Sequence, residues 1–239
     1  MYLRVPRVIF GVVAGVVAGV VAAFAFASLA SAQDAALEHI LTQMDSAAKD
    51  FRSLQAAFVW DQFTKVVQDT DTSKGSVYFQ REGSGIKMTA DITDPTPKAV
   101  LFADGEVKMY EPKIDRVTSY KTGKNQAEVE SFLVLGFGGR GHDLLKSYDV
   151  KYMGKETIDG VETAQIELVP KSEKVRSQFS QILLWIDGKT GVSVQQKLLQ
   201  PSGDFRLAKY SKIVINQKLP DGVFKLKTTP KTTYLAPQG

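Results

Sequence analysis

Short runs rich in β-branched and aromatic residues, separated by turn signals, constrain the fold of this chain most. Their side chains alternate with a period of two, and Gly, Pro and Asp stand between them at the spacing of hairpins. Asp104-Gly105 is the strongest separator, because both residues tolerate the positive φ of a tight turn. The polar cluster Gln68 to Thr72 predicts a loop after the first run. The predicted strands cover residues 54–62, 76–81, 86–92, 99–102, 106–110, 116–120, 148–154, 162–169, 179–186, 192–199 and 205–215, with a last run near 232–235.

Roughly ten or eleven strands against two or three helices predict a mainly β protein with helices, of the α+β class. A single large antiparallel sheet does not stay flat, because each strand is twisted relative to its neighbour. The sheet is therefore expected to curve into a half-open barrel, with the helices covering its mouth or its open side.

Two apolar helical faces are candidates for this cover. The first is a stripe at spacings of three and four, formed by Leu37, Ile40, Leu41, Met44, Ala48 and Phe51. The second begins near Asn125, with Glu128 at capping-box spacing, and continues through Val129, Phe132, Leu133 and Phe137. It ends at the glycine cluster 136–141, which lacks the Gly-Lys-Ser/Thr ending of a phosphate-binding loop and is interpreted as a flexible hinge. Residues 143–146 predict one more helical turn.

The first 32 residues resemble an export signal. Arg4 and Arg7 precede an uncharged apolar run from Val8 to Ala27, and Ala30-Ser31-Ala32 supplies the small residues of a cleavage site. Cleavage after Ala32 is expected, which leaves 207 of the 239 residues as one domain, 33–239, in the periplasm. The alternative is an uncleaved anchor, because an apolar run of about 20 residues can span a bilayer.

Composition excludes several classes of function. Arg4 and Arg7 are two of the 30 basic residues, so the mature part carries 28 basic against 26 acidic side chains, which argues against a nucleic-acid partner. The chain has no cysteine, and its two histidines, His39 and His142, lie far apart and read as polar surface residues. No metal site or cofactor is expected. Neither a Gly-x-Ser-x-Gly elbow nor a histidine near a nucleophile is present, so no enzyme is predicted and no catalytic residue is assigned.

The order of motifs resembles the periplasmic outer-membrane lipoprotein carrier family, LolA, and its wider superfamily, over nearly all of the mature chain. No single motif is specific, but their order and spacing are. After the helical stripe, the motifs are residues 51–58 (FRSLQAAF), 75–81 (GSVYFQR), 103–105 (ADG), 109–112 (MYEP), 168–170 (LVP) and 200–203 (QPSG), the last leading to Tyr210. The resemblance implies a half-open barrel closed by helices over an apolar cavity.

The resemblance also implies a role for Arg81 as a latch between the barrel and its helical lid. Strand alternation puts Val77, Phe79 and Arg81 on one side, so the guanidinium lies at the rim of an apolar surface and can donate to helix-end carbonyls. The family pattern Lys-Arg-Pro stands here as Gln80-Arg81-Glu82, a departure that weakens the implied latch. The alternative for Arg81 is a surface arginine on an edge strand. Candidate lipid-binding residues of the cavity and lid are Leu37, Ile40, Leu41, Met44, Phe58, Val77, Phe79, Met109, Phe132, Leu133 and Phe137; ordinary core packing is the alternative for each.

The function implied is that of a periplasmic carrier, expected to be a monomer, which binds the acyl chains of lipoproteins and shuttles them from the inner to the outer membrane. Its partners would be acylated lipoproteins or lipid, an inner-membrane lipoprotein-releasing ABC transporter and an outer-membrane receptor. Two alternatives stay open within the same superfamily. One is a periplasmic lipid-sensing regulatory protein that binds a signalling partner, and the other is a carrier of a different lipid.

Overall fold

Twelve strands form one sheet in the computed structural model, which describes the backbone of residues 13–83 and 85–236 and the side chains of residues 32–83 and 85–236. Their order is β12-β6-β5-β4-β3-β2-β1-β11-β10-β9-β8-β7. The strands are β1 Ser53–Thr64, β2 Asp69–Glu82, β3 Gly85–Asp94, β4 Lys98–Ala103, β5 Glu106–Glu111, β6 Arg116–Lys121, β7 Tyr148–Ile158, β8 Val161–Pro170, β9 Gln181–Asp187, β10 Ser193–Leu199, β11 Phe205–Ile215 and β12 Thr233–Leu235.

Neighbouring strands are antiparallel throughout, apart from the short parallel pair of β12 with β6. Strands β12 and β7 stand at the two edges and do not pair with each other, so the sheet is an open barrel. The expected fold class, a large curved sheet with helices over its open side, is confirmed.

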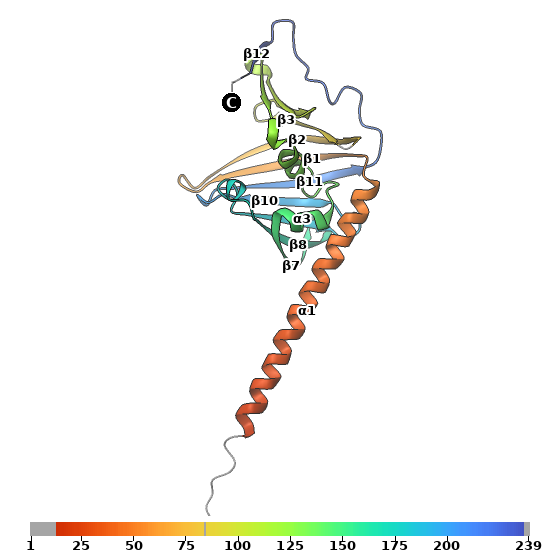
Figure 1. Cartoon of the computed structure of the whole chain (residues 1–239). Coiled ribbons are helices and arrows are strands. Elements are labelled where there is room, and N and C mark those ends of the chain that lie inside the picture. Colours follow the sequence, from red (N-terminus) through yellow and green to blue (C-terminus); the bar gives the residue numbers. More distant parts are fainter. Residues whose placement is uncertain (1–12, 84, 237–239) are drawn as a thin grey trace, which may run out of the picture.

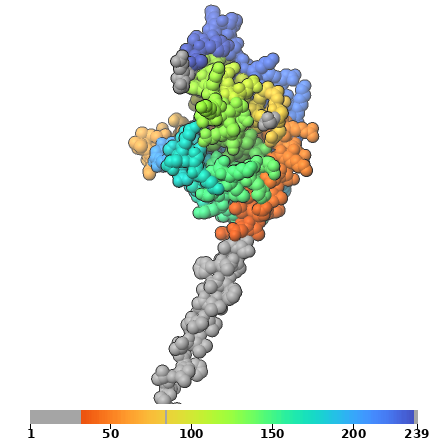
Figure 2. Space-filling model, viewed as in Figure 1, coloured from red at the N-terminus to blue at the C-terminus, as the bar shows by residue number. Residues whose placement is uncertain are grey.

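The helices gather on one side of the sheet. They are α1 Val13–Asp50, α2 Gln126–Leu133, α3 Gly141–Ser147 and the single turn α4 Glu173–Arg176, with 3-10 turns at Pro112–Ile114 and Gly123–Asn125. The end of α1 lies against the sheet beside α3 (Figure 1), and green residues of the segment that contains α2 and α3 form the neighbouring surface in the space-filling view (Figure 2).

Helix α2 begins where the sequence predicts, but its cap differs. Asn125 makes no side-chain capping bond; its Oδ1 instead accepts a hydrogen bond from Lys174 Nζ at 3.1 Å. The turn predicted at residues 143–146 is part of α3.

The predicted loop at Gln68 to Thr72 is wrong beyond its first residue. Strand β2 starts at Asp69, which pairs with Thr64, so only residues 65–68 form the turn. This end of the hairpin is exposed, and a polar sequence can extend a ladder there because no apolar face has to be buried. Thr72 also donates its hydroxyl to Asp61 Oδ1 at 2.7 Å, across the two strands.

The predicted leader lies mostly outside the residues whose side chains are described, and Arg4 and Arg7 lie outside the described backbone as well. Cleavage after Ala32 therefore stays a prediction. Among the helices searched over the described part of the chain, none is long and apolar enough to cross a membrane.

The core consists of two apolar clusters on the concave side of the sheet. One joins α1 and α3 to strands β7 to β10, and its centre is formed by Leu41, Ile166 and Leu184. The other lies on β1 to β4 and includes Phe102 and Phe137. The second cluster contains the candidate site.

Candidate functional site

An apolar cavity of about 200 Å³ lies on the concave face, between the central strands and the chain that follows α2. Its walls come from β1, β2, β3, β10 and β11 on one side and from residues 132–137 on the other. The lining residues are Trp60, Val77, Phe79, Met88, Ala90, Phe132, Leu133, Leu135, Phe137, Gln196, Leu198, Arg206, Ala208 and Tyr210.

Strand register explains why these side chains meet. Val77 and Phe79 are two residues apart on β2 and therefore share a face. On the neighbouring pair, Trp60 of β1 lies opposite Ala208 of β11, and Tyr210 lies opposite Phe58. Five of the predicted cavity residues are brought together here: Val77, Phe79, Phe132, Leu133 and Phe137.

The lid over the cavity is a short loop, residues 135–140, which we call the plug. Residues of two strands, β10 and β2, bind its carbonyl groups. Gln196 Nε2 donates to the Leu135 carbonyl at 2.7 Å, the Ser193 amide donates to Gly136 at 2.8 Å, and Arg81 Nη2 donates to Gly138 at 2.8 Å. The plug is thus fastened to the sheet at its first two residues and at Gly138.

Two glycines allow the plug to lie this close to the sheet. Gly136 and Gly138 have positive φ values of 77° and 75°. A Cβ atom on Gly136 would lie 2.6 Å from Ser193 Cβ, and one on Gly138 would lie 2.4 Å from the Phe51 ring. Gly136 and Gly138 therefore let the plug pack closely on Ser193 and Phe51. The hinge predicted at this glycine cluster stays a prediction.

Phe137 is the side chain that fills the centre of the plug. It is 2% exposed, its ring stacks on Phe79 at 5.2 Å between centroids, and it meets Tyr210 edge-on at 4.7 Å. Tyr210 donates its hydroxyl to Gln196 Oε1 at 3.2 Å, and burial raises the pKa of Tyr210. The phenol therefore stays protonated and keeps Gln196 oriented toward the plug.

Arg81 lies at one end of this arrangement, as strand alternation predicts. Its Nε donates to the Phe51 carbonyl at 3.2 Å, its guanidinium lies 5.8 Å from the centre of the Phe51 ring, and its Nη2 reaches the plug at Gly138. Phe51 directly follows the last residue of α1, whereas Gly138 lies in the turn after α2, which ends at Leu133.

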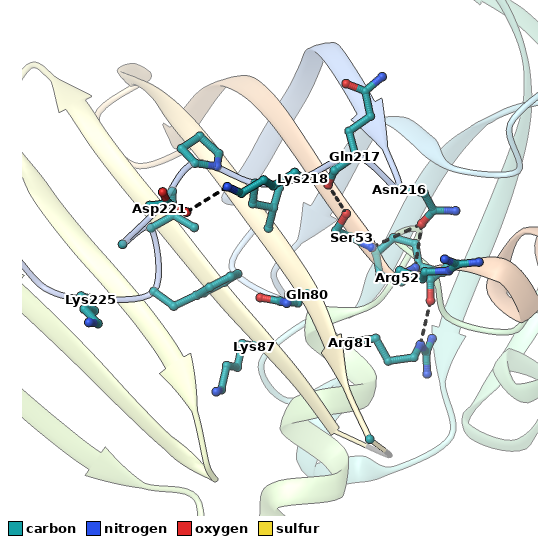
Figure 3. Close-up of a pocket in the computed structure, with 17 residues that line it drawn as sticks. Arg52, Ser53, Gln80, Arg81, Lys87, Asn216, Gln217, Lys218, Asp221 and Lys225 are labelled. Atoms are coloured by element: carbon teal, nitrogen blue, oxygen red, sulfur yellow. Dashed lines mark hydrogen bonds and ion pairs between the residues drawn. The ribbon is translucent and has the colours of Figure 1, made fainter.

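Arg81 also lines a polar groove of about 890 Å³, together with Arg52, Ser53 and the segment after β11 (Figure 3). Asn216 fixes its inner wall: Oδ1 accepts from the Arg52 amide at 2.7 Å, and Nδ2 donates to the Asp50 carbonyl at 2.8 Å. Asn216 has a φ of 58°, a conformation that Asn adopts more readily than most residues. It thereby ties the segment after β11 to the end of α1, a link that the sequence analysis did not identify.

The remaining predicted lipid-binding residues do not line the cavity in this state. Ile40, Leu41 and Met44 are buried in the cluster between α1 and β7 to β10, with Leu37 packed against it, and Phe58 is buried in the second core cluster. Met109 lies on β5 opposite Val100 and Thr118, away from the cavity. For these six residues the closed structure shows core or sheet packing, and their contact with lipid stays a prediction.

His142 is more than a surface residue. Its Nδ1 lies 2.7 Å from Asp45 Oδ2 and its Nε2 lies 3.1 Å from Glu38 Oε1, which joins α3 to α1. The hydrogen bond with Asp45, and to a lesser extent the one with Glu38, raises the pKa of His142. Burial alone would raise the pKa of Asp45, but the bonds and charge of His142 lower it. No local signal marks this pair, because 97 residues separate the partners.

Comparison with known proteins agrees with this geometry. A family model described as "Outer membrane lipoprotein carrier protein LolA" matches residues 49–227. An outer-membrane lipoprotein carrier protein of Dechloromonas aromatica is 25% identical over 183 residues, covering 77% of this chain and 81% of the relative.

Two solved structures share the fold at low identity. An uncharacterized conserved protein of Thermus thermophilus is 10% identical with a TM-score of 0.54, over 84% of this chain and 98% of that one. MucB is 14% identical with a TM-score of 0.52, over 80% of this chain; the match spans 63% of MucB, less than two thirds of its length.

Proposed function

Because this chain belongs to the outer-membrane lipoprotein carrier family, LolA, we propose that it is a periplasmic carrier which takes up the acyl chains of lipoproteins at the inner membrane and delivers them to the outer membrane. Proteins of this family are periplasmic carriers and not enzymes. The proposal includes cleavage of the leader after Ala32, uptake from an inner-membrane lipoprotein-releasing ABC transporter and delivery to an outer-membrane receptor.

The observation that carries the proposal is the apolar cavity beneath a plug held by a few polar bonds. The cavity, about 200 Å³, is smaller than the roughly 300–1,000 Å³ of most small-molecule pockets. An acyl chain therefore requires the plug to move, and Phe137 is the side chain that has to leave first.

The energetic demand on such a carrier supports this arrangement. An acyl chain gains roughly 0.8 kcal/mol per buried methylene, so a chain of about 15 methylenes is held in a membrane by about 12 kcal/mol. Transfer through water is feasible only if the protein supplies a comparable apolar surface. Opening the plug would expose the concave face from Val77 and Phe79 to Leu198, which is apolar and already preformed by the sheet.

The test is release of lipoprotein from loaded inner-membrane vesicles by the protein, exported from the full-length gene and purified. The informative variant is Leu133→Asp, which puts a charge into the cavity wall at a partly buried position. The matched control is Leu145→Asp, the same change on α3 at a side chain that is 39% exposed.

We expect the wild type and Leu145→Asp to release acylated protein as one-to-one complexes, and Leu133→Asp to release none. Complexes that contain free lipid alone would replace the proposal by the lipid-carrier alternative. Absence of any bound acyl group from the wild type would contradict the carrier and favour the regulatory alternative.

A further inference from the structure

One end of the cavity is polar, and it carries a positive charge without a negative partner. Arg206 is the only charged residue among the described residues that line the cavity, and neither Asp nor Glu is present in the lining. The other polar groups at the walls are Trp60, Gln196 and Tyr210.

The contacts of Arg206 leave most of its donors free. Its Nε donates to Gln62 Oε1 at 3.3 Å, and its guanidinium carbon lies 5.6 Å from the centre of the Trp60 ring. It forms no ion pair with any residue that the structure describes. The residue is exposed, so the guanidinium lies at the mouth of the cavity.

A second donor at this end is also incompletely bonded. Trp60 Nε1 is buried and makes no hydrogen bond of normal distance and angle in the described part of the chain, although it interacts with the Tyr210 hydroxyl closely enough to oppose the rise of that phenol's pKa. A buried indole N–H normally finds an acceptor, because leaving it unpaired costs free energy. A guanidinium fork and an unpaired N–H on the same wall are suited to the oxygen atoms of one anion.

This end is separate from the Arg81 latch. Gln80, next to Arg81, pairs with Ser53 of β1, whereas Arg206 pairs with Gln62. The two positions are nine residues apart along β1, which corresponds to about 30 Å of strand. The apolar walls lie between them.

We propose that the cavity takes lipids with an anionic group, a carboxylate or a phosphate, whose oxygens are bound by Arg206 and Trp60 Nε1 while the chain extends along the apolar walls toward the plug. This inference rests on the acyl-binding cavity of the proposed function and adds anionic lipids to its ligands, because the ester- and amide-linked chains of a lipoprotein carry no free carboxylate or phosphate. It also predicts an orientation, with the head group at the Arg206 end and the chain end beneath Phe137.

Calorimetric titration of the purified protein with decanoate, decyl phosphate and 1-decanol at neutral pH tests the proposal. The wild type is expected to bind both anions about tenfold more tightly than 1-decanol, as one charge-assisted hydrogen bond implies. Arg206→Gln is expected to lose this tenfold preference and to keep its affinity for 1-decanol. Arg52→Gln, which changes an exposed arginine at the latch end outside the cavity lining, is the matched control and should behave as wild type.

Trp60→Phe supplies an independent variant, because it removes the N–H donor and keeps a smaller aromatic ring at the cavity wall. Its affinity for the anions is expected to fall about fivefold, with 1-decanol unaffected. If Arg206→Gln does not fold, as judged by circular dichroism, Trp60→Phe decides the question alone. Between the anions, the one whose affinity falls more on either substitution identifies carboxylate or phosphate as the preferred head group.

Failure of the inference and failure of the proposed function give different results. Equal binding of all three probes, unchanged by Arg206→Gln, would overturn the head-group site and leave the acyl cavity intact. An equal loss for all three probes would show that Arg206 is structural, which also overturns the site. Absence of binding of every probe to the wild type would overturn both.

Discussion

Replacing Arg81 with Met should loosen the plug and increase the apparent affinity for an acyl ligand. Of the two side-chain bonds of Arg81, the one from Nε to Phe51 joins β2 to the short link between α1 and β1, whereas the bond from Nη2 to Gly138 joins β2 to the plug. Only the second bond distinguishes closed from open protein. A hydrogen bond to a charged group contributes about 1.5–3 kcal/mol, and the low end applies because Arg81 is exposed.

About 1.5 kcal/mol corresponds to a factor of about ten in the ratio of open to closed protein. When the closed state dominates, the apparent dissociation constant is the intrinsic one divided by the open fraction. Arg81→Met should therefore bind 1-decanol about tenfold more tightly, while its free energy of unfolding, measured with urea, falls by about 1–2 kcal/mol. An increase in ligand affinity together with a loss of stability is the signature of a latch.

Arg52→Met is the matched control, because this neighbouring arginine is exposed and its side chain forms no hydrogen bond or ion pair within the described residues. It should change neither quantity. The reasoning is refuted if Arg81→Met loses stability without any gain in affinity for 1-decanol, since Arg81 would then stabilise open and closed protein equally.

Three further perturbations test other contacts of the lid and the sheet. The carboxylates of α1 raise the pKa of His142. The stability that protonated His142 contributes is therefore fully present below the unfolded pKa of about 6.5 and is lost as pH rises through the higher folded pKa. The difference in urea midpoint between wild type and His142→Gln should accordingly shrink from pH 6 to pH 9. Phe137→Ala should lower the free energy of unfolding by about 3 kcal/mol through loss of a buried ring, whereas Phe205→Ala on the other face should cost much less; equal losses would contradict the central position of Phe137. Asp115→Ala removes the acceptor of the Thr229 and Thr232 hydroxyls, so hydrogen exchange should accelerate in residues 229–235, and unchanged exchange there would show that Asp115 does not hold β12 in place.

Local patterns predicted the sheet well because strand pairing here joins sequence neighbours, apart from β1 with β11 and β12 with β6. Asp104-Gly105 does form the turn between β4 and β5, with both residues at positive φ. The error at Gln68 to Thr72 has a physical cause: polarity marks exposure, and an exposed hairpin end can be as polar as a loop.

Patterns were less informative about the site, because its contacts join distant parts of the chain. Alternation placed Arg81 at an apolar rim, but the carbonyl it meets belongs to Gly138, 57 residues further on. The stripe of Ile40, Leu41 and Met44 indicated burial without indicating which face it meets. It packs on β7 to β10, beside the cavity and not around it. The capping-box spacing at Asn125 likewise predicted where α2 begins. It did not predict that the Asn125 side chain accepts a hydrogen bond from Lys174 instead of capping the helix.

In the proposed carrier function, the closed cavity and its plug set the conditions for loading and release. Phe137, Leu133 and Leu135 already fill part of the space that an acyl chain would take, so ligand entry exchanges one set of apolar contacts for another. The gross gain of about 12 kcal/mol for a chain of about 15 methylenes is therefore reduced by the burial that the plug gives up. Each buried apolar side chain of the plug accounts for about 1.5–3 kcal/mol of that reduction. A carrier that must return its cargo to a membrane benefits from this, because the plug competes with the lipid for the same walls and lowers the free energy needed for release.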